Sequence, residues 1–202
     1  MASLKKKTVN GIFWNATGNF SAMIIEFIVG VILARLLTPK EFGLIGIITI
    51  VIVLAEVFVN SGFSQAIVRK QNCTQRDYST VFFFNFIVGF LFFLLLLITA
   101  QPISLFFNSP ELKPLIQVLG FGLIISSTTL IQRSKLIKRI DFKLLAKISL
   151  IASILSGFLA IILAMSGFGV WSLVVKNITN KLFTSIMLWL WNKWKPDFVF
   201  CI

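Results

Sequence analysis

The chain of 202 residues contains no histidine, only two cysteines and only seven acidic residues. Without histidine it lacks the commonest metal ligand and general base. Cys73 and Cys201 are too few for a disulfide framework, so we expect no disulfide. We also find no phosphate-binding glycine loop, no Gly-x-Ser-x-Gly motif and no acidic cluster at metal-ligand spacing. These absences predict a protein that is not an enzyme and needs no metal or cofactor.

Charge of either sign is scarce, and apolar residues are abundant. Only 13% of the residues are charged, whereas 57% are hydrophobic, including 22 phenylalanines. Soluble domains are about one quarter charged, and a soluble chain of this size could not bury so much apolar surface. The composition therefore predicts an all-α integral membrane protein, in which lipid solvates the apolar side chains.

Six apolar runs are long enough to cross a bilayer, which requires about 20 helical residues. They cover residues 10–34, 42–66, 80–101, 115–133, 146–166 and 170–191. The short gaps contain Pro39, Pro102, Pro110 and Pro114 and the Gly167/Gly169 pair. We predict a single domain of six antiparallel transmembrane helices. The first run follows a basic segment but has no clear cleavage site, so we expect it to stay as an uncleaved helix.

The net charge of +12 is distributed unevenly between the gaps. Most basic residues lie before the first run, after the last one, and in the gaps around Arg69 and around residues 133–147. The positive-inside rule then predicts a multi-pass protein of the cytoplasmic (inner) membrane with both termini in the cytoplasm. Because the charges form short clusters between apolar runs, we expect membrane lipids and not nucleic acid as partners.

Four ionisable residues interrupt the apolar runs: Glu26, Glu56, Lys176 and Lys181. A charge at a helix centre costs roughly 2.5–3.5 kcal/mol on insertion scales, so such residues usually face protein or water. Asparagines accompany them on the same helical faces, namely Asn15, Asn19, Asn60, Asn177 and Asn180. We interpret these faces as the lining of a polar cavity.

The depths of these residues along their helices suggest two pairs, Glu26 with Lys176 and Glu56 with Lys181, at 1.5 Å rise per residue. One interpretation is a static interhelical pair that holds the bundle together. A second is that the lysines turn toward an anionic substrate, and a third is that the carboxylates take up a coupling proton or cation. The sequence leaves the three open.

The string "LARLLTPKEFGLIGI" joins the first two runs and contains Arg35, Pro39, Phe42 and Gly43. It resembles the first outer turn of the bacterial polysaccharide flippases, which belong to the multidrug/oligosaccharidyl-lipid/polysaccharide exporter superfamily. Four later segments fit the same family in order: "SGFSQAIVRK", "SLFFNSPELKPLIQVLG", "LIQRSKLIKRIDFKLLAKI" and "GFGVWSLVVKNI".

The resemblance implies a transporter that moves a polyprenyl-pyrophosphate-linked oligosaccharide across the cytoplasmic membrane for surface polysaccharide assembly. It also implies that this chain corresponds to one lobe of a MATE-like transporter, the N-terminal one, with the second lobe absent. The partner of this lobe is therefore left open: it is either a second lobe or a second copy of this chain in a homodimer. The alternatives are a non-transporting membrane fragment, or a half-subunit that needs another chain. A drug exporter for cations is disfavoured, because the intramembrane lysines would repel its cargo.

Overall fold

The computed structural model describes residues 2–60, 63–70, 73–192 and 194–197; the side chains of residues 2–10, 12, 15, 63 and 64 are outside that description. Every regular element in these ranges is a helix. The helices are α1 (Ala2–Leu36), α2 (Pro39–Val59), α3 (Phe63–Arg69), α4 (Gln75–Phe106), α5 (Leu112–Lys138), α6 (Phe142–Met165) and α7 (Val170–Asn192). The predicted all-α membrane bundle is confirmed.

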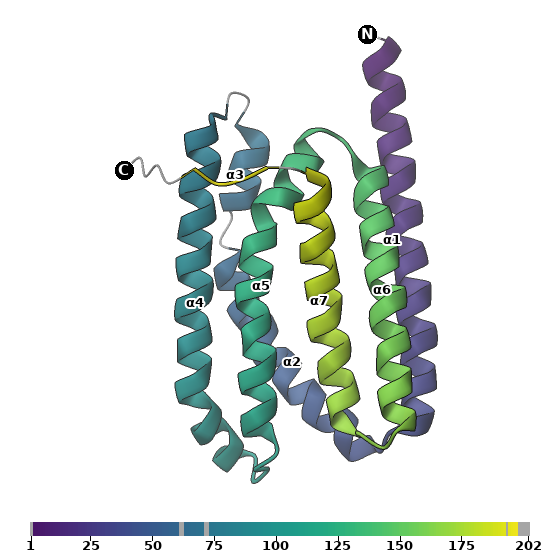
Figure 1. The fold of residues 1–202 in the computed structure, drawn as a ribbon, viewed down its shortest axis with the longest axis vertical. Helices are drawn as coiled ribbons and strands as arrows, with labels where there is room; N and C mark the ends of the chain where they lie inside the picture. The colour runs from purple at the N-terminus through teal and green to yellow at the C-terminus, as the bar shows by residue number, and fades with distance from the viewer. Residues whose placement is uncertain (1, 61–62, 71–72, 193, 198–202) are drawn as a thin grey trace.

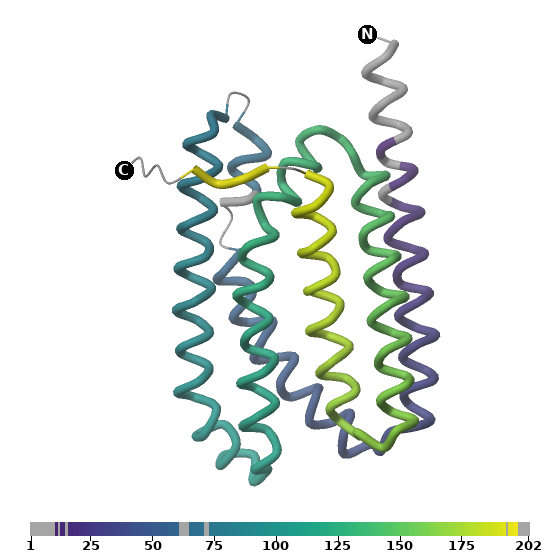
Figure 2. Tube along the Cα trace, viewed as in Figure 1, coloured from purple at the N-terminus to yellow at the C-terminus, as the bar shows by residue number. Residues whose placement is uncertain are grey.

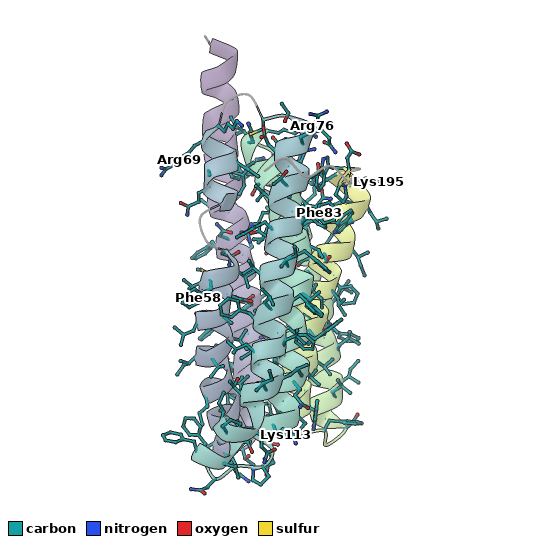
Figure 3. All side chains as sticks on the ribbon, turned by 90° about the vertical axis from the view of Figure 1, so that its left-hand side faces the viewer. Phe58, Arg69, Arg76, Phe83, Lys113 and Lys195 are labelled. Atoms are coloured by element: carbon teal, nitrogen blue, oxygen red, sulfur yellow. The ribbon has the colours of Figure 1, made fainter. Side chains whose placement is uncertain are left out.

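The six long helices of the described residues run alternately up and down the bundle (Figure 1). The turns α1–α2, α4–α5 and α6–α7 lie at one end, which we name the turn end. The start of α4 and the α5–α6 turn lie at the opposite end, which we name the basic end. Figure 3 shows Arg69, Arg76 and Lys195 at the basic end and Lys113 at the turn end. The basic clusters therefore gather at one end, as the charge pattern predicts.

The predicted run 42–66 is not one helix, which corrects the sequence analysis. Helix α2 ends at Val59 with Asn60 as its C-cap, and α3 begins at Phe63. The Asn60 N–H donates to the carbonyls of Glu56 and Phe58 and closes the last turn of α2. Asparagine favours helix ends because its side chain competes for backbone hydrogen bonds. Residues 61–62 lie outside the described residues.

Three of the four prolines expected in the gaps lie within helices, and Pro39 is the first residue of α2. Pro102 is within α4, which continues to Phe106. Pro114 is in the first turn of α5, where a missing backbone N–H leaves no helical hydrogen bond unmade. Pro102 is tolerated because neighbouring groups in membrane bundles compensate for a proline inside a helix.

Among the described residues, five helices are long and apolar enough to cross a membrane: residues 16–36 of α1, then α2, α4, α5 and α6. Helix α7 is also long, with 23 residues. It contains two lysines and three asparagines and is not among these five. The crossing of α7 therefore stays a prediction, while the chain as a whole is a multi-pass helical membrane protein.

Close helix pairs hold the bundle together. Helices α1 and α6 run side by side (Figure 2), where Gly18 faces Ala146 and Gly157 faces Val29. Helices α4 and α5 form a second pair, and α7 packs against both α5 and α6. Small residues at such contacts let the backbones approach, and dispersion then stabilises the pair. Helix α7 thus connects the α1/α6 pair to the α4/α5 pair.

Candidate functional site: a polar cavity and its ion pair

A salt bridge joins α2 to α7 within the bundle. The Lys181 Nζ lies 2.6 Å from the Glu56 Oε1. The side chains are 24% and 30% exposed, respectively, so water reaches the pair while the bundle shields most of it. The predicted pairing of Glu56 with Lys181 is therefore confirmed, and the two side chains form a salt bridge.

Helix α5 leaves room for this lysine. A Cβ atom added at Gly122 would lie 3.1 Å from the Lys181 Nζ and 3.2 Å from its Cδ. The Lys181 side chain therefore passes directly over the Gly122 backbone on its way to Glu56. A side chain at position 122 would compete with the lysine for this space.

A cavity of about 510 Å³ lies between α1, α5, α6 and α7 and includes Lys181 in its lining. Its polar lining residues are Asn19, Ser126, Thr129, Arg133, Ser149, Asn180, Lys181 and Thr184. Ile137 and Phe142 also line it, so the cavity reaches the α5–α6 turn at the basic end. The predicted polar faces of the first and last runs thus contribute to one cavity.

The electrostatics of the cavity favour an anion. Two cationic side chains, Arg133 and Lys181, line it together with hydroxyl and amide groups that can donate hydrogen bonds. The cavity has no acidic residue among its described lining residues. Charge-assisted hydrogen bonds from arginine and lysine to phosphate or carboxylate are about twice as strong as neutral ones.

The sequence analysis missed the contribution of α5. Ser126, Thr129 and Arg133 lie three and four residues apart, so they share one face of a helix. The charge pattern places Arg133 in the basic cluster of residues 133–147 and does not assign it to the cavity lining. The spacing of the hydroxyl residues from the arginine was the signal that could have revealed this face.

The second predicted pair is not formed. Glu26 is exposed on α1 and Lys176 is half-buried on α7. Their charges are within electrostatic range, but no ion pair joins them in the part of the chain that the structure describes. The reason is the order in which the helices pack side by side. Helix α6 packs against both α1 and α7, so residues at the same depth on α1 and α7 are not brought together. Neither residue lines the polar cavity.

The predicted asparagines divide into several groups. Asn180 donates to the Ser156 Oγ of α6 at 3.2 Å, and Asn19 lines the cavity. Asn177 is exposed and donates to the Leu173 carbonyl of its own helix at 3.0 Å. Asn60 caps α2 and is exposed, and the side chain of Asn15 lies outside the described residues. Asn19 and Asn180 thus support the cavity interpretation.

The predicted signature turn fixes the start of α2. The Glu41 Oε2 accepts from the Thr38 N–H at 2.7 Å, and the Thr38 hydroxyl accepts from the Glu41 N–H, with Pro39 at the first helical position. This is a capping box. The Glu41 carboxylate also lies against Gly169, whose φ of +52° favours glycine.

A further contact links the same turn to the α4–α5 turn, where the Lys40 Nζ lies 3.0 Å from the Glu111 Oε1. The signature turn therefore connects three turns of the turn end. Arg35, Phe42 and Gly43 are exposed there.

Residues 194–197, which follow α7, cross the basic end and were not predicted to do so. The Trp194 indole donates to the Gln75 Oε1 at 2.7 Å, and the Gln132 amide donates to the Trp194 carbonyl at 3.1 Å. The Lys135 Nζ lies 4.9 Å from the ring centroids of both Trp194 and Tyr78. This segment ties α4, α5 and the end of α7 together.

Comparisons with known proteins agree on one family. The family model described as "Polysaccharide biosynthesis protein" matches residues 32–202. The succinoglycan biosynthesis transport protein ExoT of Rhizobium meliloti (strain 1021) is 25% identical over 98% of this chain and 40% of its own length. The teichuronic acid biosynthesis protein TuaB of Bacillus subtilis (strain 168) is 30% identical over 99% of this chain and 42% of its own.

The lipopolysaccharide biosynthesis protein WzxC of Escherichia coli (strain K12) is 23% identical over 77% of this chain and 32% of its own length. The chain thus spans less than half the length of these curated relatives. No solved structure matches it. From the family match across most of its residues, the chain belongs to the polysaccharide biosynthesis protein family.

Proposed function

We propose that this chain forms the N-terminal lobe of a flippase that moves a polyprenyl-pyrophosphate-linked oligosaccharide across the cytoplasmic membrane. The proposal combines the family with the described site, because ExoT is named as a transport protein of polysaccharide biosynthesis. Transport of an intact molecule needs binding and conformational change but no covalent step.

The observation that carries the proposal is the cationic cavity within an apolar helical bundle. Arg133 and Lys181 line a space of about 510 Å³, and Lys181 is neutralised by Glu56 from α2. Charged side chains within membrane bundles face the bundle interior or a water-filled cavity and mark substrate or ion pathways. A pyrophosphate would compete with Glu56 for the Lys181 ammonium.

The orientation is part of the proposal. We place the basic end in the cytoplasm, because lysine and arginine are retained on that side. Helix α7 then completes a sixth crossing, and its Lys181 faces the cavity and the ion pair and not lipid. In this orientation the cavity lies toward the cytoplasmic leaflet, where lipid-linked oligosaccharides of this kind would be loaded.

Complementation of a flippase-null strain tests the proposal. We would express residues 1–202 alone, and the same residues joined to the remaining part of a longer relative, and measure surface polysaccharide. Export by the joined chain and not by residues 1–202 alone would support a lobe that needs a partner. If neither exports although both insert in the membrane, the flippase proposal is wrong.

A further inference from the structure

Helix α2 is held firmly at the turn end. The Thr38–Glu41 capping box fixes its first turn, Glu41 lies against Gly169, and Lys40 pairs with Glu111. Leu44 and Ile48 are buried in the core, where their cluster includes residues of the first half of α5. Apolar packing and polar contacts thus coincide over the first half of the helix.

The second half of α2 is buried to a similar extent as the first, and Ile52 and Ala55 belong to the same core cluster as Leu44 and Ile48. Val53, Leu54, Val57 and Phe58 are 49–64% exposed. Ala55 and Val59 are buried, and the Phe58 ring stacks on Phe92 of α4 at 5.3 Å between centroids. The Glu56–Lys181 salt bridge is the one polar contact described between this half and another helix.

A second hollow lies beside this half of α2. It has a volume of about 550 Å³ between α2 and α4 and is lined by Val51, Leu54, Ala55, Phe58, Phe92, Leu95, Leu96, Thr99, Pro102, Ile103, Phe106 and Phe107. Packing between α2 and α4 is therefore incomplete at this level. The hollow leaves space between α2 and α4 beside the Phe58–Phe92 contact.

From these features we propose that α2 pivots at its turn end and that Glu56–Lys181 is the latch that couples this motion to the polar cavity. When an anion in the cavity binds Lys181, Glu56 loses its partner and the second half of α2 moves toward α4. The pivot goes beyond the proposed function, because it concerns the motion of one helix and not the identity of the cargo.

Lys181 is suited to this role because its ammonium group can interact with the polar cavity and with Glu56 of α2. It lines the polar cavity and contacts Glu56 at the same time. A ligand can shift a conformational equilibrium only by binding the two states differently. Competition for one ammonium supplies this difference, since the anion binds Lys181 fully only when Glu56 has left.

Distances between spin labels test the pivot in the 202-residue chain reconstituted in lipid nanodiscs. In a background carrying Cys73→Ser and Cys201→Ser, one label pair would occupy Val57→Cys and Ile98→Cys, on exposed positions of α2 and α4. A second pair, Phe42→Cys with Leu105→Cys, would report the turn end. Electron–electron double resonance then gives the distance distribution of each pair.

We expect Lys181→Met and Glu56→Gln each to shift the Val57–Ile98 distribution by more than its parental width and to leave the Phe42–Leu105 distribution unchanged. Lys40→Met, which removes the salt bridge at the turn end, is the matched control and should shift neither. Unchanged distances in both latch variants, or an equal shift in the control, would overturn the pivot. Circular dichroism of each variant verifies that the helices are retained.

Adding inorganic diphosphate to the spin-labelled protein tests whether an anion in the cavity drives the motion. We expect it to shift the Val57–Ile98 distances of the parent in the same direction as Lys181→Met does, and to have no effect on Lys181→Met itself. If diphosphate leaves the parent unchanged, the coupling to the cavity is wrong. Export in the complementation assay is a separate measurement, so loss of the pivot and loss of the transport function can be distinguished.

Discussion

The two hollows of the bundle have nearly the same size and opposite chemistry. The cavity between α1, α5, α6 and α7 has about 510 Å³ and carries Arg133, Lys181 and several hydroxyl and amide groups. The hollow between α2 and α4 has about 550 Å³ and is lined by apolar side chains and one threonine. Glu56 and Ala55 are adjacent on α2, so the salt bridge to Lys181 and the wall of the apolar hollow lie within one turn of the same helix.

The volume of a hollow therefore does not identify the functional site in this protein, whereas the charge of its lining does. A membrane-facing apolar hollow can be filled by lipid and needs no polar partner. A cationic cavity within an apolar bundle is costly unless its charges are neutralised or bind a ligand. We therefore expect substitutions in the polar cavity to have larger consequences than substitutions of similar volume in the apolar hollow.

Lys181→Ala should have the largest effect on stability, because it leaves the Glu56 carboxylate without its partner. Breaking a fully buried pair costs about 3–5 kcal/mol, and partial exposure reduces this to about 2 kcal/mol here. Unfolding in a denaturing detergent series measures the change. The double variant Glu56→Ala/Lys181→Ala should be more stable than Lys181→Ala alone; if it is less stable, the two side chains do not act as a pair.

Gly122→Leu should have the next largest effect, because the new side chain occupies the space over which Lys181 reaches Glu56. Overpacking of this kind costs typically 1–3 kcal/mol. Gly30→Leu is a matched control, since nothing lies within 4 Å of a Cβ at that position. A loss of stability at Gly30 as large as at Gly122 would mean that the cost comes from helix insertion and not from the lysine.

Arg133→Gln should change anion binding and leave stability nearly unaltered. The side chain is exposed and lines the mouth of the cavity, so its loss should shift the free energy of unfolding by no more than about 0.5 kcal/mol. Losing one charged hydrogen bond should weaken diphosphate binding about tenfold. Isothermal titration at two salt concentrations measures this, and unchanged affinity would exclude Arg133 from the site.

Leu54→Trp in the apolar hollow should have the smallest effect. Leu54 is 59% exposed and lines the hollow, so a larger apolar side chain can occupy free space and change stability by less than about 1 kcal/mol. Thermal unfolding in detergent measures this change. A loss comparable to that of Lys181→Ala would contradict the contrast between the two hollows.

Periodicity and charge were sufficient to predict most of the fold. Apolar runs gave the six long helices, and alternation of basic clusters gave the common end of the bundle at which Arg69, Arg76 and Lys195 lie. The end of α2 at Val59 was missed because the hydropathy of 42–66 is continuous and does not show that Asn60 caps the helix. Hydropathy measures transfer to lipid, and helix continuity depends on local propensity as well.

The site was predicted in part for a similar reason. Helical depth placed Glu56 level with Lys181 correctly, and it placed Glu26 level with Lys176 although α6 separates their helices. Depth follows from rise per residue, but lateral neighbours depend on the packing order of the bundle. The docking of Trp194 between Gln75 and Gln132 also required the tertiary structure, because these residues are far apart in the sequence.

The most direct test of the account exchanges the two charges. The variant Glu56→Lys/Lys181→Glu, placed in the chain joined to the remaining part of a longer relative, keeps a salt bridge between α2 and α7 but puts an acid in the cavity. We predict that it inserts and folds like the parent and fails to export polysaccharide in a flippase-null strain. Normal export by the exchanged variant would show that the pair serves only to hold the helices together.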